Sequence, residues 1–133
     1  MTEKVAVILV NYESGEDLSS AVFSLSTGKR TPDVYIVVDN ASRDTSLKRA
    51  TEKFPFLRVI HNSRNVGFAK AVNQGLQEAH QCHVSVVWLF NPDALAERDT
   101  LSELLLFQDA TRKRSYRQLF SMRKERYGSL VAI

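Results

Sequence analysis

At 133 residues, the chain has the length of one compact domain and leaves no room for a second full one. Apolar residues make up 44% of the sequence, enough to bury a core, and the single cysteine excludes an internal disulfide framework and suits a reducing compartment. Seven of the 18 Lys and Arg residues but only two of the 15 acids lie after position 108, so the net charge of +3 belongs to the C-terminal end. The first apolar run, residues 5–10, is too short to span a membrane and lacks a signal-peptide cleavage pattern, which predicts a cytoplasmic protein.

Apolar runs alternate with helical spacings along most of the chain. Strands are predicted at residues 5–11, 34–38, 57–60 and 84–90. Helices are predicted at residues 15–26, 43–53 and 66–80, and a last helix begins at Thr100. Four strand–helix pairs in succession require parallel strands with right-handed crossovers. The sequence therefore predicts an α/β fold, a Rossmann-like open parallel sheet with helices on both faces.

Local signals add detail to these helices. Ser42 is expected to cap the second helix, and Thr100 and Glu103 have the spacing of a capping box at the start of the last one. In the third helix, the apolar residues that share one face are Phe68, Val72, Leu76 and Ala79. Such a stripe is typical of a helix that packs on a sheet.

Residues 109–133 form a basic tail that we separate from the domain predicted at residues 1–108. Its basic residues are interleaved with Tyr116, Phe120 and Met122, which predicts an amphipathic segment. Two interpretations stay open. The segment could be an ordinary solvated helix at a chain end, or it could contact an anionic membrane surface or a partner. Contact with a membrane would place the protein at the inner face of that membrane. A nucleic-acid partner is not expected, because no recognition motif accompanies the charge.

Short polar residues, aromatic residues or a glycine follow every predicted strand. They are Asn11 and Tyr12 after the first strand, Asp39, Asn40 and Ser42 after the second, Asn65, Gly67 and Phe68 after the third, and Asn91 and Asp93 after the fourth. The carboxyl ends of parallel strands meet at one edge of a sheet, where ligands of α/β proteins bind. Such groups can bind a base and a ribose while a cation coordinates the pyrophosphate.

The run Asn91-Pro92-Asp93 directly follows the apolar predicted strand at residues 84–90. Proline has no N–H to donate, so it ends the strand and holds Asn91 and Asp93 in an extended stub at the sheet edge. An oxygen-rich stub suits a hard divalent cation that carries phosphates. The sequence has neither a GxGxxG motif nor a GxxxxGK[ST] motif, which argues against a dinucleotide fold and a P-loop.

Three ordered segments resemble a known family. Residues 37–42 (VVDNAS), 65–75 (NVGFAKAVNQG) and 89–94 (LFNPDA) are similar to successive signatures of family 2 glycosyltransferases, and most similar to the rhamnosyltransferase-like branch. The resemblance covers roughly residues 4–108. It implies a GT-A fold, truncated relative to the full family, whose amino-terminal half binds a nucleotide-diphosphate sugar.

The resemblance also implies roles for single residues. Asp39 matches an aspartate that hydrogen-bonds the nucleobase imide, and Gly67 lies in a loop that closes over the nucleoside. Asp93 matches the second aspartate of an Asp-x-Asp metal motif, and Asn91 stands where the motif has its first aspartate. This match implies Mg²⁺ or Mn²⁺ as the cofactor. The full set implied for nucleotide binding is Asn11, Tyr12, Asp39, Asn65, Gly67, Phe68, Asn73 and Asn91, with Asp93 for the metal.

Each of these motifs has a plainer alternative. Asp39 and Ser42 could only cap a helix, Gly67 could only serve a turn, and Asn91-Pro92-Asp93 could be a turn into the last helix. The residues His80, Cys82 and His83 could suggest zinc, but a compact cluster without a second group of ligands more often belongs to a solvated helix end.

Members of the family continue into an acceptor-binding half with a general-base carboxylate, and the resemblance finds no match for that half. The acids after Asp93 are Glu97, Asp99, Glu103, Asp109 and Glu125, and none lies in a recognisable catalytic motif, so the catalytic residue is unknown. The expected partners are a UDP- or dTDP-linked sugar, a glycan or lipid-linked acceptor used in cell-wall or polysaccharide biosynthesis, and further copies in a homo-oligomer. The alternatives are a non-catalytic nucleotide-sugar-binding or assembly module and a nucleotidyltransferase. The latter would need a Gly-rich basic loop after the first strand, and the sequence lacks one.

Overall fold

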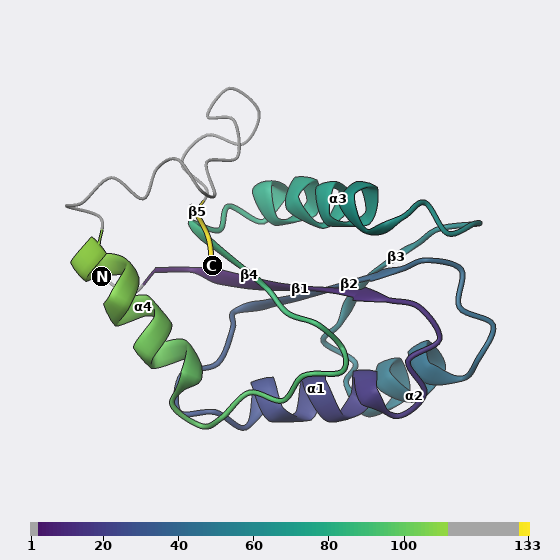
Figure 1. Cartoon of the computed structure of the whole chain (residues 1–133), viewed down its shortest axis with the longest axis horizontal. Helices are drawn as coiled ribbons and strands as arrows, with labels where there is room; N and C mark the ends of the chain where they lie inside the picture. The colour runs from purple at the N-terminus through teal and green to yellow at the C-terminus, as the bar shows by residue number, and fades with distance from the viewer. Residues whose placement is uncertain (1–2, 112–130) are drawn as a thin grey trace.

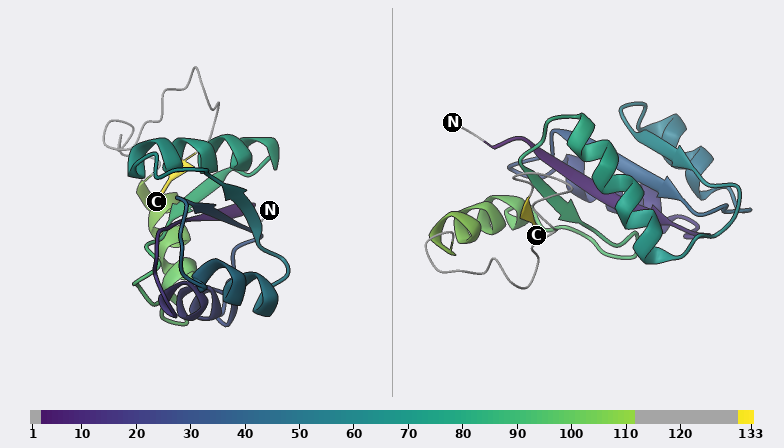
Figure 2. Two further views of the ribbon diagram at one scale, coloured as in Figure 1. Left: turned by 90° about the vertical axis from the view of Figure 1, so that its right-hand side faces the viewer. Right: turned by 90° about the horizontal axis from the view of Figure 1, so that it is seen from above.

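A parallel sheet forms the centre of the computed structural model, which describes residues 3–111 and 131–133. The strand order is β3-β2-β1-β4-β5, and all neighbouring pairs are parallel. The strands are β1 (Val5–Asn11), β2 (Val34–Asp39), β3 (Arg58–His61), β4 (Val86–Leu89) and β5 (Val131–Ala132), and the helices are α1 (Asp17–Ser26), α2 (Ser46–Lys53), α3 (Phe68–Gln81) and α4 (Thr100–Thr111). Helices α1 and α2 cover one face of the sheet and α3 covers the other (Figures 1 and 2). The predicted α/β sandwich is confirmed.

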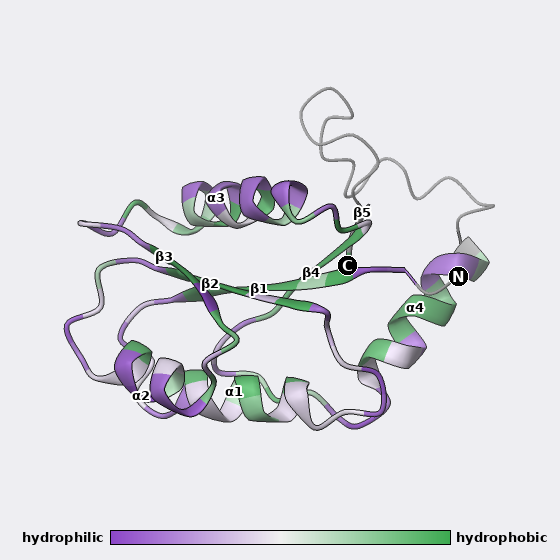
Figure 3. Cartoon of the chain, turned by 180° about the vertical axis from the view of Figure 1, so that it is seen from behind, coloured by the Kyte–Doolittle hydropathy of each residue, from purple (hydrophilic) through white to green (hydrophobic). Residues whose placement is uncertain are grey.

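The core has two parts, one on each face of the sheet. In β1, Val7 and Leu9 pack on the side of α1, α2 and α4, whereas the alternate residues Ala6 and Ile8 pack on the side of α3. A Cβ atom at Gly75 would lie 2.6 Å from Ile8 Cγ2, so this glycine lets α3 lie close to β1. Burial on both faces explains why β1 and β2 are continuous apolar runs, which stand out in the hydropathy colouring (Figure 3).

The start of α2 differs from the prediction. The helix begins at Ser46, so Ser42 does not cap it, and its hydroxyl oxygen instead accepts a hydrogen bond from the backbone N–H of Glu13 at 2.9 Å. Ala41 has a φ of +64°, so the chain makes a left-handed turn just before Ser42. The backbone N–H of Ser46, the first residue of α2, is satisfied by Asp44 instead, because Asp44 Oδ1 accepts from it at 3.1 Å.

The N-cap of α4 lies one residue before the predicted position. Thr100 is itself the first helical residue, and the first helical hydrogen bond runs from Glu103 N–H to the carbonyl of Asp99, at 3.0 Å. The position before the helix therefore belongs to Asp99. The helix also passes residue 108, where the domain boundary is predicted.

Strand β5 is the one element that the sequence did not predict. Its two residues pair with β4, and Ile133 continues the ladder by donating to the carbonyl of Val87 at 2.8 Å and accepting from Leu89 N–H at 3.0 Å. Two residues are too few to give a periodic signal. The predicted amphipathic tail falls mainly on residues 112–130, which lie outside the described residues. Within the described part of the chain, no helix combines the length and the hydropathy needed to cross a membrane.

Tyr35 gives the fold a testable pH dependence. Its ring is 7% exposed, and burial, followed by the nearby charge of Asp33, raises the pKa of its hydroxyl to about 12 from 10.0. The unfolded chain therefore loses this proton at a lower pH than the folded chain does. We expect the free energy of unfolding to fall as the pH rises from about 10 to about 12, by roughly 2–3 kcal/mol for two pKa units.

Urea unfolding at pH 8, 10 and 11.5 would measure this loss. Tyr35→Phe should remove it, whereas Tyr12→Phe, which changes an exposed tyrosine, should lose stability with pH as the unmodified protein does. An equal loss of unfolding free energy with pH in the unmodified protein and in Tyr35→Phe would contradict the assignment of this pH dependence to Tyr35.

Candidate functional site

A hollow of about 550 Å³ opens at the carboxyl edge of the sheet. It brings together six of the nine predicted site residues, which are Tyr12, Asn65, Gly67, Phe68, Asn91 and Asp93. Asn40 joins them from the end of β2, so all four strand–helix junctions contribute to the lining. The expectation that polar groups after successive strands meet at one edge is thus fulfilled by the fold.

Asn11 and Asp39 lie next to this hollow without lining it. Asn11 is fully buried, and Asp39 is 5% exposed. Asn11 Nδ2 donates to Asp39 Oδ1 at 2.8 Å and to Ser46 Oγ at 3.0 Å, while its Oδ1 accepts from the Ser14 hydroxyl. The second oxygen of Asp39 accepts from the backbone N–H of Ser42 at 3.1 Å. Asn11 therefore supports Asp39 in this structure, and its own contact with a base stays a prediction.

The same network joins the loops that follow β1 and β2. The Ser46 hydroxyl donates to Asp44 Oδ1 at 2.6 Å, and Asp44 Oδ2 accepts from the backbone N–H of Gly15 at 2.9 Å. The hydrogen bond from Ser46 is the main reason why the pKa of Asp44 lies below its usual value. Two loops that carry predicted site residues are thus joined by hydrogen bonds that run from the buried Asn11 and Ser46 out to the exposed Asp44 and Gly15.

Two aromatic rings and a glycine with a positive φ shape the wall of the hollow. Tyr12 is 52% exposed and Phe68 is 60% exposed, although Phe68 continues the apolar stripe of α3 by spacing. Gly67 has a φ of +86°, which favours glycine, and its N–H donates to Asn65 Oδ1 at 2.9 Å. A Cβ at Gly67 would meet no atom within 4 Å, so its backbone conformation, and not crowding within the chain, explains the glycine.

Not every predicted residue reaches the hollow, and some lining residues were not predicted. Asn73 is exposed and does not line it. Neighbouring residues on a helix point about 100° apart, and it is Gln74 that turns toward the sheet edge and contacts Asn62. The lining residues absent from the predicted set are Val10, Ser14, Asp17, Asn40 and Pro92. Of these, Asn40 could have been found, because it occupies the same strand–helix junction as Asp39.

Asp93 and Asn91 are both exposed on the hollow, where the predicted cation would lie. No group of three or more His, Cys, Asp or Glu side chains suited to a metal occurs in residues 3–111 and 131–133, which also leaves His80, Cys82 and His83 without a zinc site. A single carboxylate with an amide oxygen nearby still fits Mg²⁺ or Mn²⁺ when substrate phosphates and water supply the other ligands.

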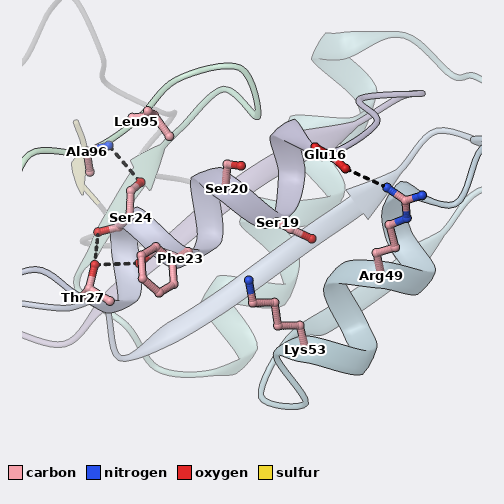
Figure 4. Close-up of a pocket in the computed structure, with 10 residues that line it drawn as sticks. All are labelled: Glu16, Ser19, Ser20, Phe23, Ser24, Thr27, Arg49, Lys53, Leu95 and Ala96. Atoms are coloured by element: carbon pink, nitrogen blue, oxygen red, sulfur yellow. Dashed lines mark hydrogen bonds and ion pairs between the residues drawn. The ribbon is translucent and has the colours of Figure 1, made fainter.

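A larger hollow, of about 700 Å³, lies elsewhere, on the outer face of α1 (Figure 4). It is bounded by α2 and residues 95–96, and a Glu16–Arg49 ion pair of 3.3 Å stands at its edge. Lys53 Nζ lies 5.5 Å from the ring centroid of Phe23 within it. None of the predicted site residues lines this hollow, and so we place the candidate site in the smaller one.

Comparison with known proteins points to one family. Residues 6–119 match the family model described as glycosyl transferase family 2. An N-acetylglucosaminyl-diphospho-decaprenol L-rhamnosyltransferase of Mycobacterium tuberculosis is 30% identical over 78 residues, which are 59% of this chain and 25% of the relative. The uncharacterized glycosyltransferase YibD of Escherichia coli is 32% identical over 89 residues, which are 65% of this chain and 26% of the relative. This chain thus spans about a quarter of the length of these curated relatives.

Solved structures show the same fold. A mannosyltransferase from Pyrobaculum calidifontis, solved in complex with GDP-Man and Mn²⁺, superposes with a TM-score of 0.71 at 25% identity over 81% of this chain and 33% of the other. S. aureus TarS 1-349, solved in complex with UDP-GlcNAc, superposes with a TM-score of 0.70 at 26% identity over 82% of this chain and 32% of the other. The sheet and its helices therefore form the GT-A arrangement implied by the sequence motifs.

Proposed function

Because this chain belongs to glycosyl transferase family 2, we propose that the hollow at the carboxyl edge of its sheet binds a nucleotide-diphosphate sugar with a divalent cation. The convergence of side chains from all four strand–helix junctions on this hollow carries the proposal. Parallel α/β sheets bind ligands at this edge. Further support comes from the neighbours solved with GDP-Man and Mn²⁺ and with UDP-GlcNAc. The family assignment also decides against the nucleotidyltransferase alternative.

The lining residues suit distinct parts of such a donor. The exposed rings of Tyr12 and Phe68 offer apolar surfaces to the nucleoside. Asp39 does not line the hollow but lies next to it, and its carboxylate would accept from the base imide if the base reaches past the lining residues. Asn91 and Asp93 offer oxygen atoms to Mg²⁺ or Mn²⁺, which when bound neutralises charge on the diphosphate leaving group. The predicted roles of Asn11 and Asn73 would be indirect, since neither lines the hollow.

We further propose that the whole protein transfers the sugar, from a UDP or dTDP donor, to a glycan or lipid-linked acceptor with inversion. Inversion requires a carboxylate that takes the proton of the acceptor hydroxyl. Glu97, Asp99, Glu103 and Asp109 are exposed, and none of them lines the donor hollow. This observation favours donor binding over catalysis for the 133-residue chain itself, and it keeps the non-catalytic module as the second candidate.

Calorimetric titration with UDP, dTDP and GDP sugars, each with and without Mg²⁺ or Mn²⁺, tests the proposed donor site. We expect saturable binding of one nucleotide class that strengthens with the cation. Lack of binding to every nucleotide sugar in the presence of both cations would rule the proposal out.

Asp93→Asn should abolish the cation dependence of donor binding. The cation acts through the phosphates, so the weaker affinity for the free nucleoside should stay almost unchanged. Asp99→Asn is the matched control, because Asp99 is an exposed acid in the same connection that does not line the hollow. Equal losses for nucleoside and nucleotide sugar in Asp93→Asn would indicate a rearranged loop and not a lost cation ligand.

The 133-residue chain alone is expected to bind the donor and to transfer sugar poorly or not at all. Slow hydrolysis of the donor can remain, because a bound cation stabilises the leaving diphosphate without a positioned base. Transfer to lipid-linked and soluble glycan acceptors, followed beside release of nucleoside diphosphate, measures the difference. Robust acceptor-dependent turnover would contradict this expectation and identify the chain as a complete transferase.

A further inference from the structure

We propose that three amide side chains outside the predicted site, those of Asn40, Asn62 and Gln74, act as positioning residues that hold the loop of residues 65–68 in place for the donor. The inference rests on the proposed function, because it concerns the wall of the same hollow. The three residues come from different places: Asn40 follows β2, Asn62 follows β3, and Gln74 lies on α3. We call them the amide relay.

The relay begins with a reciprocal pair. Asn62 Nδ2 donates to Gln74 Oε1 at 2.8 Å, and Gln74 Nε2 donates to Asn62 Oδ1 at 2.8 Å. The second hydrogen of Asn62 Nδ2 then serves Asn40 Oδ1, at 3.0 Å. Both hydrogens of Asn62 Nδ2 are thereby used, and the orientation of its amide is fixed.

The orientation passes on to the loop. With its oxygen turned to Asn62, the Asn40 amide presents Nδ2 to the carbonyl of Gly67 at 3.4 Å, and the same oxygen accepts from the backbone N–H of Val66 at 3.4 Å. These two long hydrogen bonds join the backbone of the loop to Asn40, the residue after β2, and the Gly67 carbonyl also accepts from the backbone N–H of Ala71 at 3.2 Å. Reversing the Asn40 amide would place oxygen against oxygen at Gly67, so the polarity of the relay decides where the loop lies.

The relay is anchored firmly, whereas the loop is not. The backbone N–H of Asn40 donates to the carbonyl of Asn11, and that of Asn62 to the carbonyl of Asp39, both at 2.9 Å, which extends the sheet ladder. Asn40 is 3% exposed. In contrast, Asn65, Gly67 and Phe68 are all exposed, and Val66 alone of the loop residues is half-buried against the core on the α3 side. A loop with one apolar contact and a few polar anchors is the kind of segment that opens locally, so the polar anchors contribute to its position.

The role is tested with two variants that leave every lining residue in place. Asn62→Asp has almost the same shape but offers only acceptors, so Asn40 should reverse its amide toward it and repel the Gly67 carbonyl. Gln74→Met removes the far end of the relay and keeps the length of the side chain. Gln77→Met is the matched control, because Gln77 is an exposed residue of α3 with no bond to the relay.

Three measurements separate positioning from general stability. Both relay variants should show faster hydrogen exchange at the amides of Val66 and Gly67 and about two- to tenfold weaker affinity for the nucleotide sugar, the factor expected for one neutral hydrogen bond. Asn62→Asp should have the larger effect, and exchange in β1 should match the unmodified protein. Gln77→Met should change neither quantity.

Unchanged affinity in both relay variants, or unchanged exchange at Val66 and Gly67, would overturn the inference while the unmodified protein still binds its donor. Equal acceleration of exchange in β1 would also overturn it, because the relay would then stabilise the whole domain and not the loop. Failure of the unmodified protein to bind any nucleotide sugar would overturn the proposed function instead, and the role in donor binding with it.

Discussion

Asn11→Ala is expected to lower the free energy of unfolding by about 3 kcal/mol, because it removes three hydrogen bonds from a buried network and leaves Asp39 Oδ1 without its partner. The amide of Asn11 donates to Asp39 Oδ1 and Ser46 Oγ and accepts from Ser14 in a fully buried position. A buried group that loses its partner costs roughly 1–3 kcal/mol, and an oxygen of a carboxylate, such as Asp39 Oδ1, lies at the upper end of that range. Ser46 keeps its hydrogen bond to Asp44 and therefore adds less.

Chemical denaturation of Asn11→Ala and of Asn65→Ala provides the measurement and its control. Asn65 is also an amide in a strand–helix junction, but it is exposed, and its substitution should change stability by less than about 0.5 kcal/mol. Similar stabilities of the two variants would mean that water or a local rearrangement replaces the Asn11 network.

The prediction succeeded where burial alone decides the structure. Strands β1 and β2 are apolar on both faces because helices cover both, and their positions follow directly from those runs. The collection of site residues at one edge also follows from parallel topology, which requires only the order of elements. Neither conclusion depends on a particular side-chain contact.

The predictions were wrong or incomplete where the structure depends on a partner that is distant in the sequence. Ser42 has the right residue type and position for a helix cap, but the N–H of Glu13, 29 residues away, uses its hydroxyl. Asn73 and Gln74 are equivalent by local pattern, and only the packing of α3 turns Gln74 toward Asn62. Strand β5 depends on pairing with β4, which two residues cannot signal by themselves.

Asp39→Ala is expected to weaken nucleotide binding about ten- to hundredfold, since a charge-assisted hydrogen bond to a base imide is worth roughly 1.5–3 kcal/mol. The structure makes this prediction more specific. Asp39 is 5% exposed, and each of its oxygens already accepts one hydrogen bond, from Asn11 or from the Ser42 backbone. A carboxylate oxygen has a second lone pair, so a base can still donate to Asp39 if it reaches past the lining residues.

Removal of Asp39 would also disturb the Asn11 network, so a loss of affinity alone does not identify a direct contact. UDP and N3-methyl-UDP separate the two causes, because the methyl group removes only the imide N–H. The unmodified protein should bind UDP about ten- to hundredfold more tightly than N3-methyl-UDP, whereas Asp39→Ala should bind both nucleotides equally and weakly. Asn11→Ala, which displaces Asp39 without removing it, should bind more weakly yet retain part of the preference. A preference for UDP that survives in Asp39→Ala would assign imide recognition to another group and leave Asp39 as part of the buried network.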